Sequence, residues 1–278
     1  MSTPETHAHL EFLAGLCRAR AGLRVDISRP HLIDNRLSPV ARREGYPDIN
    51  ELLAAVQARR DDKLIWRVVE AMAQGESTFF RDRAPFELFE TEMLPNLARL
   101  RGEKPVRVWS AGCGTGQEAY SLAMLIDETR GLMAGTQVEL TGSDLSERCL
   151  EKAQSGLYTQ FEVQRGLAAR RLVQHFEKRD EMWALTPRLR QMVRWRRVNL
   201  IGDLTPLGRF DVIFCRNLIS GMDTPYGAKV LASLAAALAD DGYLVLGATE
   251  TAPIGGIVRP MAGRPGVYAR DPAFRAAA

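Results

Sequence analysis

From residue 106 onward the sequence alternates short β-branched runs with helical stretches, and this alternation constrains the fold more than any other feature. Such an order is typical of a parallel sheet with helices on both faces. The apolar runs predict strands at 106–112, 138–144, 193–201, 210–217 and 243–249. The intervening spacing predicts helices at 119–127, 147–154 and 228–238.

The first 85 residues follow a different pattern. Apolar residues such as Leu10, Leu13 and Cys17 recur at helical spacing, and no run has the period of two expected for a strand. A further helix is predicted over 85–100, ended by Gly102 and Pro105. We therefore expect a helical N-terminal domain at 1–85 and a sheet domain at 86–278.

Composition excludes several classes of protein. With 46% hydrophobic residues in 278, the chain can bury a substantial core. Its four cysteines are far apart in sequence, which predicts reduced thiols, a cytoplasmic location and no metal site. No apolar run approaches the ~20 residues of a membrane span, and the first twelve residues lack the order of a signal peptide.

A basic segment interrupts the alternation between the second and third predicted strands. Residues 160–197 hold ten Lys or Arg and four Asp or Glu, an excess of six positive charges in a chain whose net charge is +3. We expect an inserted subdomain at about 160–195. Its basic residues, at 165–197, predict either a solvated face or a docking surface for an acidic partner.

A glycine-rich turn joins the first predicted strand to its helix. Gly112, Gly114 and Gly116 have the spacing GxGxG, which tightens a turn and lets the backbone approach a ligand. The turn lacks the GxGxxG fingerprint and the GK[ST] of a phosphate loop. Glu118, in the first helical turn, would repel a phosphate but suits a cationic ligand. The pattern therefore favours the sulfonium cofactor S-adenosylmethionine.

Two more polar residues stand where predicted strands end. Asp144 ends the second strand, where its carboxylate can accept hydrogen bonds from ribose hydroxyls or can cap the helix that starts near residue 147. Asn217 ends the fourth strand, where it can face the cofactor or satisfy the backbone of the strand end. An edge hairpin predicted at 257–270, with Gly263 near its turn, is a further feature of methyltransferase sheets.

Taken together, the motifs resemble the CheR family of chemoreceptor glutamate O-methyltransferases, and the resemblance covers nearly the whole chain. The segments that carry it are STFFRD (77–82), WSAGCGTGQEAYSLAM (109–124), GSDLSERCLEKAQSGLY (142–158), VNL (198–200), FDVIFCRNLI (210–219) and DDGYLVLGATE (240–250). The resemblance implies a helical N-terminal domain over a Rossmann-like S-adenosylmethionine-dependent methyltransferase sheet with a small inserted β-subdomain.

The resemblance also implies a binding site and a partner. The cofactor-binding residues it indicates are Ser77, Arg81, Gly112, Gly114, Glu118, Asp144, Asn199, Leu200, Asn217 and Leu218. The expected partner is the cytoplasmic domain of a methyl-accepting chemoreceptor, with the basic insert at 165–197 as the candidate contact. S-adenosylhomocysteine would be the product.

The implied reaction requires little acid–base chemistry. A glutamate carboxylate has a pKa of about 4.3 and is already an anionic nucleophile at neutral pH. The enzyme must align it with the methyl group and exclude water. Arg81 is predicted to orient the carboxylate, since a guanidinium can pair with it bidentately. A surface ion pair with Asp82 or a neighbouring residue is the alternative role.

Departures from the family pattern leave a second hypothesis. Gly75 and Ser77 stand where the family has Asn and Thr, and Gly221 stands where a tyrosine is expected in the acceptor site. The alternative is an S-adenosylmethionine-binding signalling module with weak or lost transfer. Nucleic acid is not an expected partner, because the insert lacks interleaved aromatic residues beyond Trp183 and Trp195.

Overall fold

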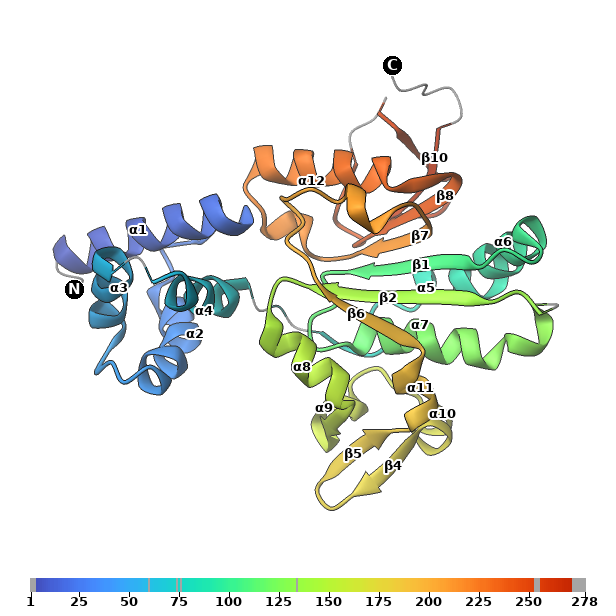
Figure 1. Cartoon of the computed structure of the whole chain (residues 1–278), viewed down its shortest axis with the longest axis horizontal. Helices are drawn as coiled ribbons and strands as arrows, with labels where there is room; N and C mark the ends of the chain where they lie inside the picture. Colours follow the sequence, from blue (N-terminus) through green and yellow to red (C-terminus); the bar gives the residue numbers. More distant parts are fainter. Residues whose placement is uncertain are drawn as a thin grey trace.

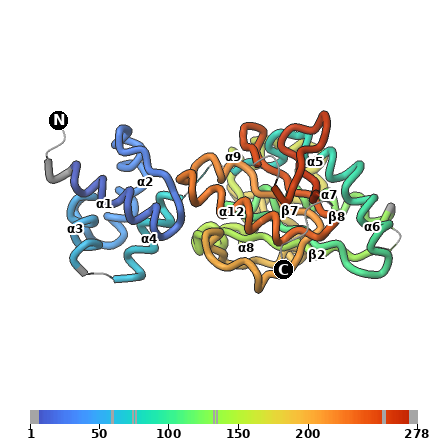
Figure 2. Tube along the Cα trace, turned by 90° about the horizontal axis from the view of Figure 1, so that it is seen from above, coloured from blue at the N-terminus to red at the C-terminus, as the bar shows by residue number. Residues whose placement is uncertain are grey.

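The computed structural model describes residues 4–59, 61–73, 75, 77–133, 135–252 and 256–271. The N-terminal helices lie together on one side of the sheet (Figure 1; Figure 2) and share one apolar core, which includes Leu13, Leu37 and Val68. They are α1 (Pro4–Ala21), α2 (Pro30–Arg43), α3 (Ile49–Arg59) and α4 (Asp62–Ala73). Their packing supports the proposed helical domain, whose boundary at residue 85 stays a prediction.

A seven-stranded sheet, in the order β6-β2-β1-β7-β8-β10-β9, forms the centre of the molecule. Its first five strands are parallel, and β10 and β9 form the antiparallel hairpin at one edge. The strands are β1 (Val106–Ala111), β2 (Val138–Asp144), β6 (Val193–Arg197), β7 (Phe210–Cys215), β8 (Leu238–Leu246), β9 (Val258–Pro260) and β10 (Val267–Arg270). The predicted α/β class, its strand order along the chain and its edge hairpin are confirmed.

Three predicted boundaries were wrong by four or five residues, and one of them is the start of the last helix, α12 (Thr224–Ala236), which begins at 224 rather than 228. β6 ends at Arg197 rather than 201, because the next residues turn, with the Asn199 carbonyl accepting the Gly202 N–H at 3.0 Å. β8 begins at Leu238 rather than 243, immediately after the last helix.

Helices cover both faces of the sheet (Figure 1). On one face Phe214 packs against Phe86 and Phe89, with ring centroids 5.7 and 5.8 Å apart. On the other face Trp109 packs against Phe210 at 5.1 Å, in the core that α12 covers. The elements are α5 (Ala84–Leu88), η1 (Phe89–Met93), α6 (Leu94–Arg101), α7 (Gln117–Glu128), η2 (Arg130–Leu132), α8 (Glu147–Ser155), η3 (Thr205–Leu207), η4 (Ile219–Gly221) and α12 (Thr224–Ala236).

The expected insert between β2 and β6 contains a three-stranded antiparallel sheet in the order β3-β5-β4. Its buried Tyr158 and Phe176 meet the ring of Phe79 at 5.2 and 5.7 Å, so it packs on the segment that follows α4. The elements are β3 (Leu157–Thr159), α9 (Gln160–Gln164), α10 (Ala169–His175), β4 (Phe176–Arg179), β5 (Met182–Leu185) and α11 (Pro187–Gln191). This small sheet begins at Leu157, before the proposed start of the insert at about residue 160. The limits of about 160–195 remain a prediction.

A buried carboxylate ties the amino-terminal end of β7 to its neighbours. Asp211, 5% exposed, accepts hydrogen bonds from the Arg101 Nε at 2.8 Å and from the Arg107 N–H at 2.6 Å. One side chain therefore joins β7 to β1 and to the end of α6.

Replacing this carboxylate is expected to destabilise the fold. Asp211→Asn removes the charge that pairs with Arg101, so we expect the free energy of unfolding to fall by about 2 kcal/mol. Urea denaturation followed by circular dichroism measures the change. An exposed pair gives the control: Glu177→Gln, beside Arg179, should alter the free energy of unfolding by less than about 0.5 kcal/mol. Equal effects of the two substitutions would contradict the prediction.

Candidate active site

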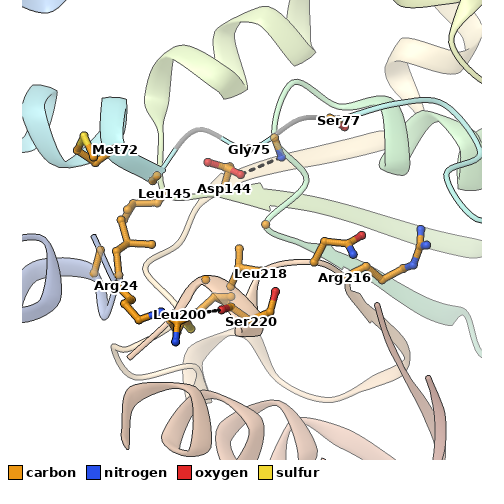
Figure 3. A pocket seen from close by; sticks show the side chains of 18 of the residues that line it. Arg24, Met72, Gly75, Ser77, Asp144, Leu145, Leu200, Arg216, Leu218 and Ser220 are labelled. Carbon is orange, nitrogen blue, oxygen red and sulfur yellow. Dashed lines mark hydrogen bonds between the residues drawn. The ribbon is translucent and has the colours of Figure 1, made fainter. Parts of the chain in front are cut away.

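A cavity of about 750 Å³ lies at the carboxyl ends of β1, β2 and β7, between the sheet and the N-terminal helices (Figure 3). This edge of a parallel sheet is where α/β proteins bind ligands. The cavity lining brings together all ten predicted site residues: Ser77, Arg81, Gly112, Gly114, Glu118, Asp144, Asn199, Leu200, Asn217 and Leu218. Their individual roles toward a cofactor remain predictions.

The glycine turn approaches its neighbours closely enough to exclude side chains. Gly112 has a φ of +71°, and a Cβ there would lie 2.5 Å from a methyl carbon of Leu218. Gly116, with a φ of +96°, precedes α7, and a Cβ there would lie 2.8 Å from that of Ala153. The turn is thus held between the loop after β7 and α8, with its backbone facing the cavity.

Asp144 holds the glycine turn in place. Its Oδ2 accepts the Gly114 N–H at 2.8 Å, the bond drawn as the dashed line at Asp144 in Figure 3. Its Oδ1 accepts the Ser146 N–H at 2.9 Å. The proposed capping role was wrong: the residue that caps α8 is Ser146, whose Oγ accepts the Cys149 N–H at 3.3 Å. Burial raises the pKa of Asp144 despite these hydrogen bonds. The carboxylate therefore shapes the cavity even before any ligand binds.

A chain of charges runs behind the glycine turn and centres on Arg216, which the sequence reasoning missed. Its side chain is 1% exposed, pairs with Asp82 at 2.7 Å and lies 3.5 Å from Glu118 Oε2. Glu118 Oε1 also accepts the Ser110 hydroxyl at 2.8 Å. The signal in the sequence was a charged residue directly after a fully buried strand, where an unpaired charge would be costly.

Burial raises the pKa of Glu118, and the Arg216 guanidinium opposes that rise. The Nε of Arg216 is buried and has no hydrogen-bond partner among the described residues. Glu118 is thus a carboxylate at the cavity wall with the Arg216 guanidinium behind it and Arg81 near enough to lower its pKa as well. A carboxylate in this position suits a positively charged ligand group in the cavity.

The segment that carries Arg81 is anchored on both sides of that residue. Phe79 and Phe80 are buried, and the Phe80 N–H donates to Ser121 Oγ at 2.9 Å. Phe80 and Asp82 both have positive φ, +47° and +53°, a conformation that persists only where the surroundings hold it. The Asp82 side chain pairs with Arg216, and the alternative role of Arg81 in an ion pair stays a prediction. Arg81 lines the cavity.

The opposite wall joins the sheet to the helices. Asn199 Nδ2 donates to the Arg20 carbonyl at 2.8 Å, and Asn217, the second residue after β7, adopts a φ of +59°. Arg24 also lines the cavity, and its Nη2 donates to the Ser220 carbonyl at 3.1 Å. Sequence reasoning missed Arg24, because only the fold brings residues separated by almost 200 positions together.

Much of the positive charge of the insert is neutralised within the chain. Arg171 contacts Glu128 through two nitrogens, Arg188 pairs with Asp127, and Arg197 pairs with Glu70 at 2.7 Å. Arg170 and Lys178 are exposed. The free basic surface of the insert is therefore smaller than its excess of six charges suggested.

Two further features of the described ranges concern metals and membranes. No group of three or more His, Cys, Asp or Glu side chains within them is placed to share a metal ion. Within the same ranges, every helix is too short or too polar to cross a membrane.

The sheet, its glycine turn and the carboxylates at its edge define a methyltransferase of the α/β class that binds S-adenosylmethionine. Residues 75–259 match the family described as "CheR methyltransferase, SAM binding domain". The chain is 34% identical to chemotaxis protein methyltransferase 1 of Pseudomonas aeruginosa, over 88% of this chain and 90% of that protein. It is 33% identical to the chemotaxis protein methyltransferase of Vibrio parahaemolyticus, over 90% of each. The chain belongs to the CheR methyltransferase family.

Solved structures align more loosely. The plantazolicin methyltransferase BpumL in complex with SAH is 14% identical, with a TM-score of 0.36, over 86% of this chain and 61% of that one.

The residues present fit the cofactor. A sulfonium and an ammonium group are both cationic, and Glu118 and Asp144 are anionic groups on the cavity wall. The cavity also exceeds ~300 Å³, the lower end of the range for small-molecule sites. We propose that Glu118 holds the amino-acid part and Asp144 the adenosine part.

Cofactor affinity should depend on pH through Glu118. Because burial raises its pKa, Glu118 is protonated at acidic pH, and affinity should increase as the pH rises through this elevated value. Glu118→Gln should weaken S-adenosylmethionine binding about tenfold at neutral pH. It should also reduce the rise of affinity with pH, so that only the part of the pH dependence due to Asp144 remains. Isothermal titration calorimetry at several pH values measures both effects. Glu139→Gln, at a half-exposed site on β2 outside the cavity, is the control, and an unchanged pH profile in Glu118→Gln would contradict the assignment.

Proposed function

We propose that this protein transfers the methyl group of S-adenosylmethionine to glutamate side chains of methyl-accepting chemoreceptors, forming glutamate methyl esters. The observation that carries the proposal is the cavity itself, whose lining combines carboxylates, glycine backbone and the arginines Arg81 and Arg24. The names of the relatives support a chemotaxis protein as the acceptor. We propose that the acceptor glutamates belong to the cytoplasmic domain of the receptor, and we infer a cytoplasmic location for the enzyme on that basis.

The residues of the cavity suit an anionic nucleophile. No histidine is among the described residues that line it, and its carboxylates, those of Glu118, Asp144 and Asp26, already accept hydrogen bonds within the protein. An amine or hydroxyl acceptor would need a base to take its proton, whereas a glutamate carboxylate does not. The chemistry that this site favours is therefore esterification of a carboxylate.

Positioning accounts for the catalytic contribution of the chain. The bound cofactor supplies an activated methyl group on a positively charged sulfur. Arg81 would pair with one side of the acceptor carboxylate and leave an oxygen directed at that methyl. Leu200 and Leu218 line the same cavity with apolar surface, which would exclude water from the reacting atoms.

Arg81→Ala should separate binding from transfer. We expect kcat/KM for a receptor fragment to fall by about 100-fold, since the acceptor carboxylate loses its bidentate partner, with a much smaller change in S-adenosylhomocysteine affinity. Labelled S-adenosylmethionine and base-labile methyl ester provide the assay. Arg83→Ala removes an exposed arginine two residues away and should leave kcat/KM unchanged. Wild-type transfer by Arg81→Ala would remove the orienting role.

Gly221 supports a second candidate, a cofactor-binding signalling module with weak transfer. It lines the cavity, and a Cβ at this position would have no neighbour within 4 Å. The space that the expected tyrosine would begin to fill is therefore open. Tight binding of S-adenosylhomocysteine without ester formation on any receptor fragment would favour this candidate.

We also propose that the exposed basic residues of the insert contact the receptor. Arg170 and Lys178 lie on its surface, where opposite charge would speed association. The double substitution Arg170→Glu and Lys178→Glu should weaken receptor-fragment binding at least several-fold at low salt, and the difference should shrink at high salt. Surface plasmon resonance measures this, with the exposed Arg99→Glu on α6 as the control. Equal effects of the double substitution and the control would leave the insert a solvated face.

A further inference from the structure

Glu250 is a buried carboxylate with three backbone partners at the edge of the active site. It follows β8, is 4% exposed, and has no role in the site as described so far. Its Oε2 accepts the N–H of Asn217 at 2.7 Å and that of Gly247 at 2.8 Å, and its Oε1 accepts the N–H of Ser220 at 2.9 Å. A carboxylate with several N–H donors is a strong anchor, because each hydrogen bond is charge-assisted.

The loop that it anchors is strained and closely packed. Asn217 has a left-handed backbone, at a φ of +59°, which its surroundings must hold. A Cβ on Gly247 would lie 2.7 Å from Asn217 Nδ2 and 2.8 Å from Glu250 Oε2. The glycine, the carboxylate and the turn are therefore fitted to one another with no spare room.

The same loop forms two boundaries of the cavity. Asn217 and Leu218 line it on the cofactor side, next to the glycine turn. Beyond them, the Gly221 carbonyl accepts the Arg24 N–H at 3.0 Å, and Met222 forms an isolated antiparallel bridge with Leu23. Moving the loop would thus displace both the cofactor wall and the contact with the N-terminal helices (Figure 3).

We propose that Glu250 is a positioning residue that holds the loop 217–221 in its binding-competent conformation and so joins the cofactor wall to the helical part of the chain. Glu250 lies outside the cavity lining and acts through Asn217 and Ser220. This inference rests on cofactor binding by the cavity and is independent of the identity of the methyl acceptor.

Glu250→Gln tests the proposal with little change in side-chain shape. The amide keeps one acceptor oxygen and places an NH2 group against at least one backbone N–H, so the loop should loosen. We expect S-adenosylhomocysteine affinity, measured by calorimetry, to fall at least about tenfold. Amide hydrogen exchange at 217 and 220 should accelerate in the free protein and slow again when S-adenosylhomocysteine binds. Neither measurement needs an acceptor, so failure here is distinct from failure of the proposed receptor substrate.

Asp211→Asn is the matched control. Asp211 is another buried carboxylate that accepts a backbone N–H, at the other end of β7 and outside the cavity lining. Asp211→Asn should lower the free energy of unfolding while leaving S-adenosylhomocysteine affinity within about twofold of wild type. Unchanged affinity and exchange in Glu250→Gln, or an equal loss of affinity in both variants, would overturn the proposal.

Glu250→Asp keeps the charge on a shorter side chain, and it is the test variant to use if Glu250→Gln fails to fold. The proposal then expects weakened S-adenosylhomocysteine binding and faster exchange at 217 and 220. Wild-type values for both would overturn it.

Discussion

The site depends on the hydrogen bonds between the turn after β1 and the end of β2. The Gly112 and Cys113 N–H groups donate to the Ser143 carbonyl at 2.8 and 2.9 Å, and the Gly114 N–H donates to Asp144. These bonds extend the pairing of two parallel strands beyond the sheet and into the binding edge. The position of the glycine backbone, and with it the first turn of α7 and Glu118, follows from this continuation.

Buried charges stabilise the rest of the cavity wall. Arg216 links Asp82 to Glu118, behind the glycine turn. Glu250 accepts two N–H groups from the loop after β7 and one from Gly247, after β8. Buried charges persist only when they are paired and hydrogen-bonded, so each group constrains its partners. The cavity is therefore organised before the cofactor arrives, which lowers the cost of ordering the site on binding.

The insert illustrates how charge counts in a sequence can mislead. Its ten basic residues predicted either a solvated basic face or a docking surface, yet several of them pair with acidic residues on other elements, such as Glu128 at the end of α7 and Glu70 on α4. These pairs join the insert and its flanking strand to the rest of the chain. Any docking surface must use the smaller number of basic residues that remain exposed.

The sequence by itself determined the α/β class and the edge hairpin, because periodicity is a local property. Glycine spacing and polar residues at strand ends, which are also local, indicated five residues of the cavity lining: Gly112, Gly114, Glu118, Asp144 and Asn217. The resemblance to the family indicated five more: Ser77, Arg81, Asn199, Leu200 and Leu218. The sequence motifs also indicated the cofactor through the resemblance. Only the tertiary structure decided that Asp144 supports the glycine turn while Ser146 caps α8. It likewise decided that Arg24 reaches Ser220 and that Glu250 anchors Asn217. Contacts between residues so distant in sequence arise from packing, which no local pattern encodes.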